Sequence, residues 1–183
     1  MDPLKIEESF IALKAVQGAY TAPLAPLFSY RSMMDRKWHR DPQLMPRKGW
    51  SEQDVMLCSR GFHIFPLSRL DDWWSESTDY YHQDEDRHIW VVEVSGYAVF
   101  DRAKGAASQL RFMNKLTKTE LELIQNSGLA TSSWTPQSQG KFRSVTEQLG
   151  FDGLVMCQLA EATVSGGPYA QYGYRPRLLD VSS

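Results

Sequence analysis

A turn and the start of a strand coincide at Cys58-Ser59-Arg60-Gly61-Phe62-His63-Ile64-Phe65. Gly61 permits a backbone bend that a residue with a Cβ would resist. Because side chains alternate along a strand, Phe62 and Ile64 then lie on one face, and His63 and Phe65 on the other. A histidine is thereby held at a fixed place on a strand. We take His63 as the first candidate for a functional residue.

Length and composition predict one globular domain over residues 1–183. With 183 residues, of which 42% are hydrophobic, the chain can bury a core without disulfides or metals. The net charge of −2 and the pI near 6.1 argue against a non-specific nucleic-acid binder, since such a protein needs an excess of Lys and Arg.

The cysteines and the first residues bear on the compartment. Cys58 and Cys157 lie far apart in apolar, strand-like contexts, which suits reduced thiols in the core of a cytoplasmic protein. A disulfide between two strands is the alternative. The first residues lack the basic and apolar regions of a signal peptide, and no apolar run approaches the length of a membrane span. We therefore expect a cytoplasmic protein that does not associate with a membrane.

Hydrophobic periodicity predicts strands and a few helices in no simple βαβ order. Strands are predicted over residues 10–17, 27–31, 55–58, 62–65, 154–157, 169–174 and 178–181. Residues 89–100 form a hairpin or a bent strand because Gly96 interrupts them, and residues 106–113 suit either a strand or a helix. Helices are predicted over residues 67–77, from the capping pattern Thr117-Lys118-Thr119-Glu120 to Gly128, and over residues 141–149.

Two segments between these elements carry charge. Residues 31–50 form an irregular, basic insert in which Trp38 and Trp50 are interleaved with Arg and Lys. We expect this insert to be an exposed loop, or alternatively a contact surface for phosphates or an acidic partner. The acidic residues 79–87 are expected to be solvent exposed.

Each candidate side chain has a structural and a functional interpretation. His63 is either a hydrogen-bonded structural residue or part of a site, and Cys58 with His63 suggests a thiolate–imidazole nucleophile without a third orienting group. Trp73 and Trp74 place one ring in the core and leave the other able to stack on a base or a nicotinamide ring. The histidines lack metal-ligand spacing, so no metal site is predicted.

The C-terminal half carries a resemblance to a known family. Leu149-Gly150-Phe151-Asp152-Gly153 ends a predicted helix, an apolar strand follows, and an aromatic strand leads to Pro176 and Leu178-Leu179-Asp180-Val181. This order resembles the end of an ADP-ribosyltransferase-type domain, and Gly61 to Phe65 with the helix after it is similar to the nicotinamide side of that family's cleft. The resemblance implies an α+β fold of split antiparallel sheets, with a few peripheral helices, that clamps NAD.

The same resemblance implies roles for individual residues. Lys14 and Arg31 would hold the NAD pyrophosphate, while His63 with Trp73 or Trp74 would lie beside the nicotinamide ribose. The residues near the anomeric carbon would be Gln171 or Glu161. Active members place a glutamate where this chain has Gln171. A neutral amide stabilises an oxocarbenium-like charge less than a carboxylate does.

A second resemblance covers roughly the first two thirds of the chain. Residues 13–16, 58–63, 92–96 and 104–110 resemble an uncharacterised domain of phage and bacterial genomes with a Cys-x-x-Gly-aromatic-His core, which implies no activity. Two functions therefore stay open. One is an NAD-using ADP-ribosyltransferase-like effector that modifies a host protein or nucleic acid. The other is a catalytically inactive binding protein on the same scaffold that captures a protein or nucleotide partner.

Overall fold

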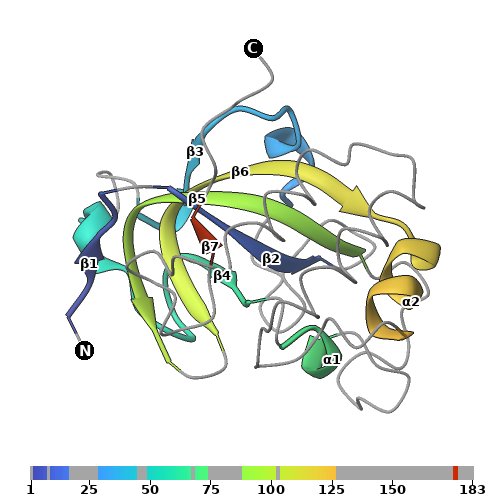
Figure 1. The fold of residues 1–183 in the computed structure, drawn as a ribbon. Coiled ribbons are helices and arrows are strands. Elements are labelled where there is room, and N and C mark those ends of the chain that lie inside the picture. Colours follow the sequence, from blue (N-terminus) through green and yellow to red (C-terminus); the bar gives the residue numbers. More distant parts are fainter. Residues whose placement is uncertain are drawn as a thin grey trace.

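A curled antiparallel sheet makes up most of the structure (Figure 1). The computed structural model describes residues 2–7, 9–16, 29–44, 49–66, 69–73, 88–101, 104–126 and 175–176. The strands are β1 (Leu4–Lys5), β2 (Phe10–Val16), β3 (His39–Arg40), β4 (Phe62–Ile64), β5 (His88–Phe100), β6 (Gly105–Leu116) and β7 (Arg175–Pro176). Their order is β3-β6-β5-β2-β7, with β1 paired to β5 and β4 paired to β6.

The sheet curls until β4 reaches back to β2. β4 pairs with β6, and Phe65, just after β4, forms an isolated antiparallel bridge with Leu13 of β2. Two backbone hydrogen bonds of 2.9 Å make this bridge, one in each direction between Leu13 and Phe65. Each strand of the set β2, β5, β6 and β4 therefore contacts two others of the set, so that the four close into a ring. The described strands lie in one sheet rather than in a split pair.

The longest strands, β5 and β6, form a hairpin whose turn includes Asp101 and Lys104. The pairing shifts register between Val91 and Val92 and again between Ser95 and Ala98, and Gly96 lies in the second irregularity with φ 83°. Residues 89–100 are thus a bent strand and not a hairpin of their own. Residues 106–113 lie in β6, which settles the choice between strand and helix.

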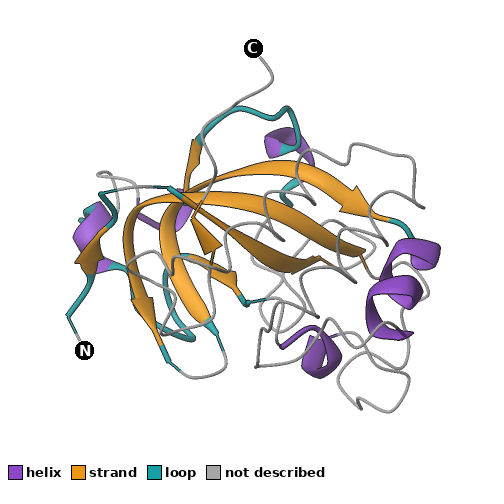
Figure 2. Cartoon of the chain, in the orientation of Figure 1, coloured by secondary structure: helices purple, strands orange, loops and turns teal. Residues whose placement is uncertain are grey.

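Helices are short and few among the described residues (Figure 2). They are α1 (Leu70–Trp73), α2 (Lys118–Asn126) and the 3-10 turns η1 (Arg31–Met33), η2 (Pro42–Leu44) and η4 (Glu52–Asp54). α2 begins as predicted, because the Thr117 hydroxyl accepts a hydrogen bond from the Glu120 backbone N–H at 3.1 Å. The α+β class fits loosely, since the sheet predominates. None of the helices in this part of the chain is long and apolar enough to cross a membrane.

The main core lies inside the curl. Aromatic rings meet there from several elements: Phe10 contacts Phe100 with centroids 5.9 Å apart, and Tyr30 contacts Phe62 at 6.0 Å and Phe112 at 5.9 Å. Met33 of η1 is buried in the same cluster, so the insert contributes to this core. The prediction that residues 62–65 pack as a strand with Phe62 and Ile64 buried is confirmed.

The described part of the insert over residues 31–50 packs more closely against the sheet than predicted. β3 pairs with β6, and Met33, Asp41 and Leu44 are buried, so the described part of the insert is built into the sheet and is not simply an exposed loop. The expected exposure holds for Trp38 and Trp50, which are 42% and 39% exposed. The strand predicted over residues 27–31 is wrong in its described part, where Arg31 begins η1.

The strand predicted over residues 55–58 is also wrong. Met56 bridges to Arg60 instead, and the backbone N–H of Arg60 donates to the Met56 carbonyl at 3.0 Å, which closes a tight turn. Cys58 sits in this turn with φ 61° and is exposed, so it is not the core thiol that the sequence predicts. An apolar run is compatible with a turn here because Val55 alone reaches deep into the core, while Met56 faces solvent.

The remaining predicted elements lie outside the described residues. These are the helix over residues 141–149, the strands over 154–157, 169–174 and 178–181, the acidic loop over 79–87, and Cys157. α1 falls within the predicted helix over residues 67–77.

Candidate functional site

Lys14 lies inside the curl of the sheet. Its side chain is buried, and its Nζ donates a 2.8 Å hydrogen bond to the backbone carbonyl of His63. The ammonium also lies 4.8 Å from the ring centroid of Tyr30. Burial lowers the pKa of Lys14 to about 7, an effect that the negative charge of Asp41 partly opposes. The Lys14 side chain is therefore part of the core, where it contacts the backbone and aromatic rings.

His63 is half-buried on β4 and is held by the turn before it. Its Nε2 accepts a 2.7 Å hydrogen bond from the backbone N–H of Cys58. Burial, followed by the positive charges of Lys14 and Lys104, lowers the pKa of His63 to about 4. The imidazole is thus neutral at neutral pH, and the nitrogen that would take up a proton already accepts a hydrogen bond.

Cys58 meets a different partner through its sulfur. The Nζ of Lys104, at the β5–β6 turn, donates to Cys58 Sγ at 2.9 Å, and this hydrogen bond raises the pKa of Lys104. His63 is bonded to the backbone of Cys58 and not to its thiol. The predicted thiolate–imidazole arrangement is therefore not formed, because the cation beside the sulfur is a lysine.

The other predicted residues are placed separately or fall outside the described part. Arg31 is exposed in η1, and Trp73 lies in α1, although its side chain is not described. Trp74, Glu161 and Gln171 lie outside the described residues. Of the predicted site residues, the structure thus brings together Lys14 and His63.

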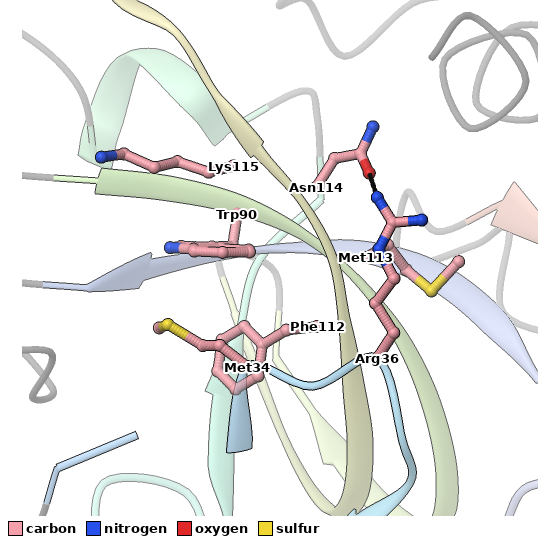
Figure 3. A pocket seen from close by; sticks show the side chains of 7 residues that line it. All are labelled: Met34, Arg36, Trp90, Phe112, Met113, Asn114 and Lys115. Atoms are coloured by element: carbon pink, nitrogen blue, oxygen red, sulfur yellow. Dashed lines mark hydrogen bonds between the residues drawn. The ribbon is translucent and has the colours of Figure 1, made fainter. Parts of the chain in front are cut away.

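A pocket elsewhere on the sheet was not foreseen from the sequence. It has a volume of about 390 Å³ and opens between β5, β6 and the segment after η1 (Figure 3). The residues that line it are Met34, Arg36, Trp90, Phe112, Met113, Asn114 and Lys115. Trp90 is partly buried and forms an aromatic wall; it packs on the fully buried Phe112 ring, with the two planes at 83° and the centroids 5.5 Å apart.

Positive groups stand at opposite ends of this pocket. Figure 3 shows the Lys115 ammonium at one end and the Arg36 guanidinium at the other, with the Trp90 ring between them. Arg36 Nη2 donates to Asn114 Oδ1 at 3.0 Å, which orients both side chains. None of the lining residues that the structure describes carries a carboxylate. Nearby Asp35 instead accepts hydrogen bonds from the Lys37 backbone and the His39 ring.

Long-range pairing builds the pocket, which explains why the sequence did not reveal it. Trp90 lies directly across from Lys115 in the β5–β6 ladder, and Arg36 reaches the same place from the insert. In the sequence Trp90 belongs to a continuous apolar run, which indicates a core position. The features of the sequence that point to the pocket are the aromatic ring within that strand and the basic residues of the insert. Only the register of the hairpin brings these side chains together in space.

Comparison of the chain with protein-family models, with curated proteins and with solved structures finds no match in any of the three. Within the described ranges, no three His, Cys, Asp or Glu side chains are grouped so that they could hold a metal ion.

Proposed function

We propose that the protein is a binding protein that holds a small, planar, negatively charged ligand in the pocket between β5 and β6. One observation carries this proposal: the partly buried Trp90 ring, supported by the buried Phe112 ring, lies between two positive groups, Arg36 and Lys115, with no carboxylate among the described lining residues. Pockets of this kind combine apolar walls with a few polar groups that fix the orientation of the ligand.

The two parts of the pocket have separate tasks. Stacking on an indole removes apolar ring surface from water, and offset or edge-to-face contacts with aromatic rings add to this. The guanidinium of Arg36 and the ammonium of Lys115 supply charge-assisted hydrogen bonds, which are about twice as strong as neutral ones. A neutral planar molecule would use only the stacking on the indole, and a small inorganic anion would use only the charge-assisted hydrogen bonds.

The described contacts support binding over the NAD-dependent transfer that the sequence resemblance implies. Lys14 is buried against the His63 carbonyl, and the His63 ring accepts a hydrogen bond from Cys58. These bonds join parts of the fold and leave neither group poised for a substrate. An ADP-ribosyltransferase-like enzyme, with NAD as cofactor and Gln171 or Glu161 at the ribose, is the competing proposal.

Calorimetric titration tests the proposed function. The parent protein is titrated with planar anions, including benzoate, adenosine monophosphate and NAD, and with benzamide as a neutral planar control. We expect a planar anion to bind, Trp90→Ala to weaken its binding, and Trp90→Phe to retain most of it. Trp50→Ala is the matched control, because Trp50 is an exposed tryptophan that packs on Arg60 away from the pocket lining.

Two results would overturn the proposal. One is that no planar anion binds the parent, or that one binds the folded Trp90→Ala variant as tightly as the parent. The other is release of nicotinamide from NAD by the parent, measured by chromatography, which would show an enzyme. Thermal melts of every variant establish that a loss of binding is not a loss of folding.

A further inference from the structure

We infer that the ligand of the pocket is a nucleoside monophosphate, whose base stacks on Trp90 while its phosphate binds Arg36 or Lys115. This inference rests on the proposed function and narrows it to one chemical class. Size, charge and hydrogen-bonding character each contribute to it.

Size favours a single nucleotide. Ligand pockets in proteins span roughly 300 to 1,000 Å³, and this one, at about 390 Å³, lies near the lower limit. One base with its sugar and phosphate suits such a volume. A whole dinucleotide such as NAD would leave one of its halves outside the lining residues.

Charge favours a phosphate over a carboxylate. Arg36 and Lys115 bring two positive charges to the lining, and no described lining residue brings a negative one. A phosphate monoester carries about −1.5 to −2 at pH 7, whereas an aromatic carboxylate carries a single negative charge. The phosphate therefore matches the charge of the pocket more closely. Guanidinium groups also bind phosphate through two parallel hydrogen bonds, which fixes its orientation.

The polar groups of the pocket are mainly donors. Arg36 and Lys115 have no acceptor atoms, and the Oδ1 of Asn114 already accepts from Arg36. The Asn114 amide is thereby oriented so that its NH₂ group is the part left to donate. Donors of this kind require acceptor-rich ligands, and a nucleotide supplies phosphate oxygens together with the ring nitrogens or carbonyls of its base.

The aromatic wall suits a base. Every nucleobase has a π-face, and base–aromatic stacking tolerates different bases. Trp90 presents its partly buried indole between the two cationic ends, and the buried Phe112 ring, set at 83° to it, supports the indole from the core (Figure 3). The pocket is therefore expected to accept more than one base, with the phosphate as the shared requirement.

The experiment compares ligands that share one part of the nucleotide. The full chain is titrated with the four common nucleoside monophosphates, adenosine, inorganic phosphate, benzoate and NAD. We expect at least one monophosphate to bind about tenfold or more tightly than adenosine, phosphate or benzoate. NAD is expected to bind more weakly than that monophosphate, because half of it lies outside the pocket.

Variants of the pocket residues test which residue binds the phosphate and which residue binds the base. Arg36→Ala should weaken monophosphate binding about tenfold and leave adenosine binding unchanged, and Trp90→Ala should weaken both. Lys37→Ala is the matched control, since Lys37 is an exposed cation of the same insert that does not line the pocket. Raising the salt concentration should weaken monophosphate binding and leave adenosine binding unaffected.

The outcomes separate this inference from the proposed function. Benzoate binding as tightly as any monophosphate would overturn the nucleotide assignment, but it would still support the proposal that the protein binds a planar anion. NAD binding more tightly than every monophosphate would likewise overturn the mononucleotide assignment. If no planar anion binds, both proposals fail. Equal losses for Arg36→Ala and Lys37→Ala would show that the charge acts at long range and would overturn the placement of the phosphate in the pocket.

Discussion

The ammonium of Lys14 donates its 2.8 Å hydrogen bond to the backbone carbonyl of His63, and so links β2 to β4 inside the curled sheet. Next to this bond, Leu13, which precedes Lys14, and Phe65, two residues after His63, exchange two backbone hydrogen bonds. The side-chain bond and the backbone bridge close the curl at the same place. Two residues that the sequence assigns to an NAD site therefore hold the sheet together.

Replacing Lys14 with methionine should change how stability depends on pH. Burial lowers the pKa of Lys14 to about 7 in the folded protein, against 10.5 as its ordinary value. Between pH 7 and 10.5 the unfolded chain binds this proton and the folded chain does not, so stability rises with pH in that window. The slope approaches about 1.4 kcal/mol per pH unit. Lys14→Met should remove this rise.

Urea denaturation midpoints of parent and variant, measured from pH 6 to 11, test this expectation. The difference between the two proteins is the quantity to follow. Lys115→Met, on an exposed lysine of β6, is the control and should keep the slope of the parent. A parent whose stability is flat between pH 7 and 10 would show that Lys14 is not held in the low-pKa environment described.

His63 should make the protein less stable in acid. Its pKa is lowered to about 4, so between pH 6.5 and 4 the unfolded chain binds a proton that the folded chain does not. Stability is then lost as the pH falls from 6.5 towards 4, because burial and the positive charges of Lys14 and Lys104 keep the folded His63 ring neutral while the unfolded chain takes up the proton. The titration of the His63 ring, followed by nuclear magnetic resonance, should have its midpoint near 4. A midpoint near 6.5 would contradict this environment.

Local signals in the sequence predicted several elements well. The apolar run over residues 10–17 predicted β2, the glycine turn before Phe62 predicted β4, and the Thr117 to Glu120 pattern predicted the start of α2. Each depends on residues that are neighbours in the sequence. Backbone preferences and alternation are sufficient to specify such elements.

The pocket depends on information that local patterns do not carry. Trp90 and Lys115 meet because two register shifts in the β5–β6 hairpin set them opposite one another. Cys58 was predicted as a core thiol, yet it lies in a turn at φ 61°, a conformation that its own side chain does not favour. Tertiary contacts, with Lys104 and with the His63 ring, hold Cys58 there.

Gly96 should resist substitution for two separable reasons. Its φ is 83°, and a Cβ added there would lie 2.1 Å from the Oγ of Ser108. That hydroxyl accepts the Tyr97 backbone N–H at 2.9 Å and donates to Glu52, so it cannot turn away without losing both bonds. Gly96→Ala should cost roughly 2 kcal/mol or more in the free energy of unfolding.

A second glycine separates strain from steric overlap. Gly49 has φ 76°, and no atom lies within 4 Å of the Cβ that an alanine would add there. Gly49→Ala should therefore cost only the backbone strain, about 1 kcal/mol. Adding Ser108→Ala to Gly96→Ala should recover part of the loss. Equal losses at the two glycines, measured by denaturant unfolding, would show that the overlap with Ser108 is relieved at no cost.

The ion pair between Glu93 and Arg111 should be more important to stability than any exposed pair. The two residues lie opposite each other on β5 and β6, and Arg111 Nε bonds to a Glu93 carboxylate oxygen. The Glu93 side chain is 1% exposed, and its other oxygen accepts a 2.7 Å hydrogen bond from Ser9. Arg111→Met removes the positive charge and should cost roughly 3–5 kcal/mol, because a buried charge then loses its counter-ion.

The double variant decides whether burial of the carboxylate is the cause. Glu93→Gln combined with Arg111→Met removes both charges, and it should be clearly more stable than Arg111→Met alone, since an ion pair replaced as a unit costs little. Arg111 also lies 5.2 Å from the Trp38 ring, but this exposed contact should contribute less than about 1 kcal/mol. Trp38→Ala measures that part separately. If the single and double variants unfold at the same urea concentration, the loss comes from packing, and Glu93 does not depend on Arg111 for its charge.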